Sequence, residues 1–213
     1  MTADRLVLWR HGRTAWNAAG RFQGQTDVPL DDVGRVQVKD AAEMLAERLA
    51  GRRCRVVSSD LSRAQATAQA FTDLVGGSIT LDPLLREVHG GRWQGLLRSE
   101  IEQEDPAVFA AWRDGADEVA GTTGERRSEA GRRAEAAVRA HAAPMDGGVL
   151  VVASHGAALR GAVQSLIGLA GWSADLFGGL RNAHWIDLAR RGEGWVLDAY
   201  NVGPVRGSVG TEG

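Results

Sequence analysis

The sequence predicts an α/β fold, a three-layer α/β/α sandwich built on a mostly parallel sheet with a C-terminal hairpin. Short apolar runs, typical of buried strands, alternate along the chain with longer segments whose apolar residues recur at helical spacing. Two of the apolar runs end directly in a His-Gly pair. In parallel sheets, ligands are bound beyond the carboxyl ends of the strands, so a site is expected at these two strand ends.

The first half of the chain begins with a strand expected at residues 5–9, where RLVLW breaks into polar, Gly-containing sequence. Residues 33–50 are expected to form a helix with Asp31 or Asp32 as its N-cap. Its apolar positions at helical spacing are Val36, Ala41, Met44, Leu45 and Leu49. Three further elements follow: a strand at 55–58, a helix over 61–75 and a short strand at 79–81.

The middle of the chain, residues 105–147, is mostly helical in pattern, with Gly121 and Gly124 marking a loop. The clearest strand of the sequence comes next, at residues 149–154 (VLVVAS), because its apolar run is rich in β-branched side chains. The residues that follow, 155–168, continue as a helix. This order of strand, loop and helix is that of a parallel α/β unit.

The last elements are expected to be a hairpin of strands at 185–188 and 195–200, joined by the turn-like sequence RRGEG. One domain is expected over residues 1–203 because no internal repeat or linker divides the chain. The tail, 204–213, is rich in Gly and is expected to be disordered.

Composition narrows the classes of partner. The formal net charge is -2, which gives no support for binding nucleic acid, and Lys39 is the only lysine among 25 basic residues. An anionic ligand must therefore be bound by a local cluster of arginines. Cys54 is the only cysteine, and no apolar run approaches the roughly 18 residues that cross a bilayer. Without a signal-peptide pattern at the N-terminus, we expect a cytoplasmic protein with no membrane partner.

The two His-Gly pairs carry the chemistry. His11 follows Arg10 at the end of the first strand, and His155 follows Ser154 at the end of the strongest strand. If both strands are parallel, the histidines meet at one edge of the sheet. Glycine after each histidine lets the backbone approach a ligand closely, and a helix starting at Gly156 would aim free N–H groups at an anion. The alternative is that each histidine merely ends a strand.

Four sequence blocks resemble the histidine phosphatase superfamily (phosphoglycerate mutase-like) in the family's order. They are LWRHGRTAWN, continued by RFQGQTDVPLDDVGRVQ; SSDLSRAQATA at 58–68; LREVHGGRWQG at 85–95; and VVASHGAALR at 151–160. The resemblance implies that His11 is the nucleophile and Glu87 the general acid. It also implies a phosphate-binding set, with Arg10, Arg63 and His155 as its clamp and Asn17, Gln23, Gly24 and Gly156 as further contacts.

These roles agree with what hydrolysis of a phosphate ester requires. Arg10 and Arg63 would neutralise the dianion with two permanent charges, and His155 could add a third when protonated. A neutral imidazole, with a reference pKa of about 6.5, attacks phosphorus without a separate base. Glu87 would give its proton to the leaving alkoxide and would then activate water. No metal or other cofactor is expected, since neither a cysteine cluster nor a P-loop nor a G-x-G-x-x-G motif is present.

Within the superfamily, short loops favour a phosphatase acting on a small phosphate ester over a mutase, which must shield its phosphohistidine from water. HGGRWQG (89–95) and GGLRNAHWIDL (178–188) are similar to actinobacterial glucosyl-3-phosphoglycerate phosphatases. TTGERRSEAGRR (122–133) departs from their Gly-Glu-Ser helix start, because Arg126 stands where Ser is expected. A phosphoglycerate mutase and a non-catalytic phospho-ligand-binding protein stay open, as do a homodimeric assembly and roles for Arg13, His89, Glu125, Asn182 and His184.

Overall fold

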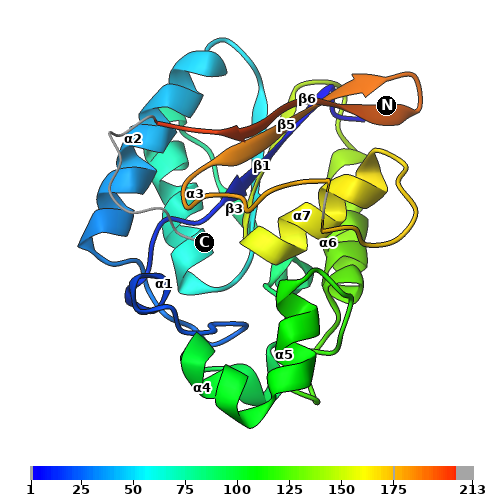
Figure 1. Cartoon of the computed structure of the whole chain (residues 1–213). Helices are drawn as coiled ribbons and strands as arrows, with labels where there is room; N and C mark the ends of the chain where they lie inside the picture. Colours follow the sequence, from blue (N-terminus) through cyan, green and yellow to red (C-terminus); the bar gives the residue numbers. More distant parts are fainter. Residues whose placement is uncertain (1, 175, 205–213) are drawn as a thin grey trace.

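A six-stranded sheet forms the middle layer of the computed structural model, which describes residues 2–174 and 176–204 (Figure 1). The strand order is β3-β2-β4-β1-β5-β6. The first four strands are parallel, and β5 is antiparallel to both β1 and β6. The strands are β1 (Arg5–Arg10), β2 (Cys54–Ser58), β3 (Ile79–Leu81), β4 (Val149–Ser154), β5 (Trp185–Arg191) and β6 (Gly194–Val202). The predicted mostly parallel sheet with a C-terminal hairpin is confirmed.

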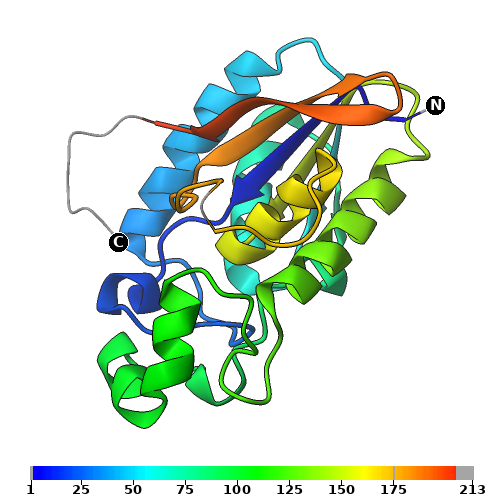
Figure 2. The same ribbon diagram turned by 45° about the vertical axis from the view of Figure 1, so that its right-hand side comes forward.

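Helices cover both faces of the sheet, as the predicted three-layer fold requires (Figures 1 and 2). Helices α2 and α3 pack on one face, and α6 and α7 on the other; α1, α4 and α5 lie beyond the carboxyl end of β1. The helices are α1 (Ala15–Ala19), α2 (Asp32–Arg48), α3 (Ser62–Val75), α4 (Arg98–Glu104), α5 (Pro106–Arg113), α6 (Arg127–Ala142) and α7 (Gly156–Leu166), with short 3-10 turns at Pro83–Leu85 and Gly91–Trp93.

The alternation of side chains along β1 explains why both faces are covered. Leu6 and Leu8 pack into the cluster under α6 and α7, whereas Val7 and Trp9 pack into the cluster under α2 and α3. A strand that is buried on both faces needs a continuous apolar run, which is what the sequence shows at this position. A third apolar cluster lies under α4 and α5, and it contains Val88, Trp93, Ile101, Phe109 and Trp112.

Helix α2 corrects one detail of the sequence analysis. Asp31 is its N-cap, and the Asp31 carboxylate accepts a hydrogen bond of 2.7 Å from the amide of Gly34. The buried face, however, is made by Gly34, Val38, Ala41, Ala42 and Leu45. Val36 and Met44, which were predicted to face the core, are 44% and 38% exposed. Residues two apart on a helix point in different directions, so Val36 and Val38 cannot share one face.

The other predicted strands and helices agree with the structure to within two residues at each end. The exceptions are the hairpin, whose strands are longer than predicted, and the segment 105–147, where only α5 and α6 are helical and α6 ends at Ala142. The turn of the hairpin is therefore reduced to Gly192 and Glu193. Helix α1 was not predicted. Of the tail predicted to be disordered, residues 205–213 lie outside the described part of the chain. Among the residues that the structure describes, no helix is both long and apolar enough to cross a membrane.

Close contact between α6 and α7 depends on two glycines. A Cβ atom at Gly131 would lie 2.6 Å from the Cα of Gly161, and a Cβ at Gly161 would lie 2.6 Å from the Cα of Gly131. Only residues without a side chain allow the two backbones to meet in this way. The two helices consequently hold each other in a fixed position, which matters for the site because α6 and α7 both carry residues that surround it.

Candidate active site

The two predicted histidines come together because β1 and β4 are adjacent parallel strands. Arg10 is in register with Ser154, so the next residue of each strand is a histidine at the same edge of the sheet. The rings of His11 and His155 have their centroids 5.1 Å apart. The amide of His11 also donates to the carbonyl of Ser154 at 3.0 Å. Both side chains are buried, at 3% and 0% exposure.

His11 is held as a neutral imidazole. Its Nδ1 lies 2.6 Å from the carbonyl oxygen of Gly12. A carbonyl only accepts, so Nδ1 carries the proton and the lone pair resides on Nε2. Burial lowers the pKa of His11 well below its usual value, and the charges of Arg63 and Arg10 lower it further. Among the described residues, none hydrogen-bonds Nε2, which is therefore the nitrogen available for attack.

Arg63 lies at the start of α3 and its side chain is fully buried. It donates from Nη1 to the carbonyl of Thr26 and from Nη2 to the carbonyl of Gly24, both at 2.8 Å. Its Nε donates to Nδ1 of His155 at 3.2 Å. Burial lowers the pKa of Arg63 to about 10, so the group stays charged near neutral pH. Three of its five N–H groups are used, and one on each terminal nitrogen remains for an anion.

His155 has both ring nitrogens engaged by protein groups. Nδ1 accepts from Arg63, and Nε2 lies 2.9 Å from the hydroxyl of Ser59. Burial, followed by the charge of Arg63, lowers the pKa of His155 well below its usual value. His155 is therefore neutral at physiological pH in this structure. His155 would supply the third positive charge expected from the sequence only if a bound anion caused its ring to take up a proton.

Arg10 reaches the site past the first residue of α7. Its Nη1 donates to the carbonyl of Leu180 at 2.5 Å. A Cβ at Gly156 would lie 3.4 Å from Nε of Arg10, an ordinary van der Waals distance, so the guanidinium lies directly beside the start of α7. Gly12 is also needed for packing. A Cβ there would lie 2.6 Å from the carbonyl oxygen of Gly34, so Gly12 permits close packing of α2.

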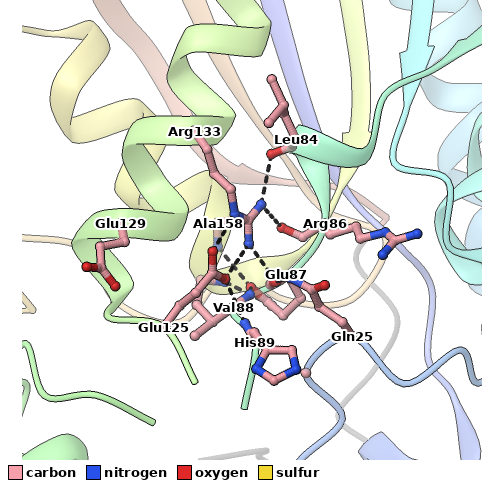
Figure 3. Close-up of polar contacts among 12 residues, drawn as sticks. Gln25, Leu84, Arg86, Glu87, Val88, His89, Glu125, Glu129, Arg133 and Ala158 are labelled. Atoms are coloured by element: carbon pink, nitrogen blue, oxygen red, sulfur yellow. Dashed lines mark hydrogen bonds and ion pairs between the residues drawn. The ribbon is translucent and has the colours of Figure 1, made fainter. Parts of the chain in front are cut away.

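Glu87 lies in the loop that follows β3, beside Ala158 of α7 (Figure 3), and its charge acts on Arg63. Its carboxylate accepts hydrogen bonds from the amides of Ala157 at 3.2 Å, Ala158 at 3.0 Å and Val88 at 2.9 Å. The first N–H groups of α7 were expected to be free for an anion. For Ala157 and Ala158 this was wrong, because Glu87 takes them. A carboxylate is well stabilised at a helix N-terminus.

Helix α1 and the loop between α1 and α2 supply the remaining predicted contacts. Asn17 accepts at Oδ1 from the amide of Thr14 at 3.2 Å, and Gln23 accepts at Oε1 from the Thr14 hydroxyl at 2.9 Å. Both side-chain amides thus use their oxygen inside the protein. Within the described residues, neither amide nitrogen has a hydrogen-bond partner, so both remain as donors. Gly24 contributes its carbonyl to Arg63, which ties this loop to α3.

Residues whose roles the sequence left open are now placed. Asn182 donates from Nδ2 to the carbonyl of His11 at 3.1 Å and to Oδ1 of Asn17 at 3.3 Å. His184 accepts the Arg10 amide at its carbonyl, at 2.9 Å. Arg13 forms an ion pair of 2.9 Å with Asp31 at the start of α2. Across residues 2–174 and 176–204, no three His, Cys, Asp or Glu side chains are grouped so as to hold a metal ion.

Two residues were not singled out from the sequence. Ser59 contacts His155, and the Thr67 hydroxyl accepts the amide of Gly12 at 3.3 Å. Both lie within the block SSDLSRAQATA, on either side of Arg63. In the sequence, the signal that could have identified Ser59 and Thr67 is their position near Arg63 in this block. Only the packing of α3 against the end of β1 assigns them to the site.

Comparison with known proteins agrees with this geometry. Residues 6–203 match the family model of the histidine phosphatase superfamily (branch 1). A glucosyl-3-phosphoglycerate phosphatase of Mycolicibacterium vanbaalenii is 38% identical, over 95% of this chain and 96% of the relative. A probable phosphoglycerate mutase of Yersinia pestis is 34% identical, over 78% and 75%. Among solved structures, mycobacterial glucosyl-3-phosphoglycerate phosphatase in complex with VO3 superposes with a TM-score of 0.85 at 35% identity, covering 93% of this chain and 99% of that one.

Proposed function

The chain belongs to the histidine phosphatase superfamily and is a phosphatase, and we propose that it hydrolyses its substrate through a phosphohistidine formed on His11. The observation that carries this proposal is the state of the His11 ring. Its proton is fixed on Nδ1 by the Gly12 carbonyl, and burial keeps it neutral, so the Nε2 lone pair faces a site flanked by Arg10 and Arg63. A neutral nucleophile beside two guanidinium groups suits a phosphate dianion.

The proposed first step breaks the ester bond. Nε2 of His11 attacks phosphorus in line with the leaving oxygen, and the P–O ester bond breaks as the P–N bond forms. Arg10 and Arg63 bind the phosphoryl oxygens, together with the amide nitrogens of Asn17 and Gln23. Glu87 gives its carboxyl proton to the departing alkoxide. The alcohol leaves, and the phosphoryl group stays on His11.

The proposed second step returns the protein to its starting state. Glu87 is now a carboxylate, held by the backbone amides of Val88, Ala157 and Ala158. It takes a proton from a water molecule, whose oxygen attacks phosphorus and breaks the P–N bond. Inorganic phosphate is released, and Glu87 carries the proton that the next turnover needs. The same carboxyl group therefore serves as acid and then as base.

We propose that the substrate is glucosyl-3-phosphoglycerate or a related phosphorylated glycerate or sugar. Support comes from relatives of that name, which match 95% of the chain, whereas the relative named a probable mutase matches 78%. A non-catalytic phospho-ligand-binding protein is disfavoured because the histidines, arginines and carboxylate of the proposed mechanism are all present around one site. Cytoplasmic location and homodimeric assembly stay predictions from the sequence.

The test compares two leaving groups in the Glu87→Gln variant. An alkyl phosphate expels a poor leaving group and needs the acid, whereas p-nitrophenyl phosphate leaves as a stable phenolate. General acid catalysis contributes about 10²–10⁴-fold, so phosphorylation by 3-phosphoglycerate should slow by that order and phosphorylation by the aryl ester much less. The variant should also accumulate phosphoenzyme with the aryl ester, because water activation is impaired.

Glu104→Gln, which changes an exposed carboxylate on α4, is the matched control and should behave like the wild type. Equal losses for both esters in the phosphorylation step, with no trapped phosphoenzyme, would assign proton donation to another group.

A further inference from the structure

The loop that carries Glu87 is bound by one arginine of α6. Arg133 donates from Nη1 to the carbonyls of Leu84 at 2.8 Å and Arg86 at 2.5 Å, and from Nη2 to the carbonyl of Glu87 at 2.7 Å (Figure 3). Leu84 is part of the 3-10 turn at Pro83–Leu85, whereas Arg86 and Glu87 lie in no strand or helix, and the Glu87 carbonyl also accepts from Nε2 of Gln25 at 3.0 Å. The guanidinium therefore supplies the donors that a neighbouring strand would otherwise provide.

Glu125 completes the arrangement. Its carboxylate forms a bidentate ion pair with Arg133, in which Nε donates to Oε1 at 2.9 Å and Nη2 donates to Oε2 at 2.8 Å. All five N–H groups of Arg133 are then used. Oε2 of Glu125 also accepts the amide of His89 at 2.8 Å, and the Glu125 amide donates to the His89 carbonyl at 2.8 Å. The loop is thus held on both sides of Glu87.

The charge state of Glu125 separates it from the acid role. Burial alone would raise the pKa of its carboxyl, but the hydrogen bonds from Arg133 and from the His89 amide outweigh burial and lower the pKa. Glu125 is therefore ionised near neutral pH. It has no proton to give to a leaving group.

From this geometry we propose that Arg133 and Glu125 are positioning residues for Glu87, fixing the backbone from which its carboxyl group reaches the scissile oxygen. Neither residue needs to touch the substrate. Helix α6, which carries Arg133, is packed on α7, whose first amides hold the Glu87 carboxylate. The backbone and the side-chain end of Glu87 are consequently fixed by two helices that form one unit. The inference rests on the proposed role of Glu87 as the acid.

A positioning role and a purely structural role predict different effects on the rate of phosphorylation when the leaving group is changed. A displacement of about 1 Å of a catalytic group can cost about 100-fold in rate. If Arg133 acts through Glu87, then Arg133→Met and Glu125→Gln should slow phosphorylation by 3-phosphoglycerate about 10–100-fold but phosphorylation by p-nitrophenyl phosphate much less. Arg133→Lys keeps the charge but has only three donors on one nitrogen, so it should restore little of the rate. Arg132→Met, on the exposed side of α6, should have wild-type rates.

A double variant provides the decisive comparison. Glu87→Gln combined with Glu125→Gln should phosphorylate from 3-phosphoglycerate no more slowly than Glu87→Gln alone, because the acid is already lost. Additive losses in the double variant, or equal losses for both esters in Glu125→Gln, would overturn the inference. Should Arg133→Met fail to fold, Glu125→Gln keeps the volume of the side chain and still decides the question. If Glu87→Gln itself shows no dependence on the leaving group, the proposed role of Glu87 as the acid fails instead.

Discussion

Acidification should destabilise this protein in a pH range set by its buried histidines. The pKa values of His11 and His155 are lowered, mainly by burial, so the folded chain stays unprotonated at these positions while the unfolded chain takes up protons near pH 6.5. The unfolded state therefore binds more protons, and stability that is present above pH 6.5 is lost as the pH falls. At pH 5.5, each histidine should cost about 1.4 kcal/mol relative to pH 8, or about 2.8 kcal/mol for the pair.

Urea unfolding followed by tryptophan fluorescence between pH 8 and pH 5.5 would measure this effect. The double variant His11→Asn/His155→Asn should lose most of the dependence. A smaller slope should remain because burial also lowers the pKa of His184. Carboxyl groups such as those of Asp60 and Glu125, whose pKa values are lowered, titrate at more acidic pH and do not contribute in this range. A double variant that retains the full wild-type slope would refute the assignment of the loss to these two side chains.

Two further predictions concern packing and the His11 backbone. Gly131→Ala should lower the free energy of unfolding by about 1–3 kcal/mol, since its Cβ would lie 2.6 Å from the Cα of Gly161. Gly178→Ala is the control: no atom lies within 4 Å of its Cβ, so the free energy of unfolding should change little in the same urea titration. Asn182→Ala removes the 3.1 Å hydrogen bond to the His11 carbonyl and should lower kcat about tenfold without changing the fold, as steady-state kinetics and circular dichroism would show; an unchanged kcat would mean that Asn182 does not position His11.

Much of this architecture could be predicted because local sequence determines it. Apolar runs on β1 and β4 end in His-Gly pairs, and the rule that parallel strands share one carboxyl edge then brings His11 and His155 together. The start of α2 followed in the same way from Asp31, an N-cap residue. Helix boundaries are harder to predict where the capping group comes from a residue outside the helix. Helix α6 begins after Arg126 without a serine cap, and the Asp117 carboxylate accepts the Ser128 amide at 3.0 Å instead.

What could not be predicted depends on contacts between residues far apart in the chain. The Glu87 carboxylate occupies the amides of Ala157 and Ala158, 70 and 71 residues away, and no local pattern indicates this. Arg63 was assigned to the phosphate clamp, but its bonds to the carbonyls of Thr26 and Gly24 show that it also holds the loop between α1 and α2. Such contacts arise only when α7, α3 and the loops meet at the edge of the sheet.

The most direct test of the central claim is to trap the phosphoenzyme and locate the phosphoryl group. Glu87→Gln should be mixed with p-nitrophenyl phosphate, quenched in base, where phosphohistidine survives, and digested for mass spectrometry. Phosphorylation on His11, absent from His11→Ala treated in the same way, is the expected result. A phosphoryl group on any other residue, or hydrolysis by His11→Ala at the wild-type rate, would contradict the assignment of His11 as the nucleophile.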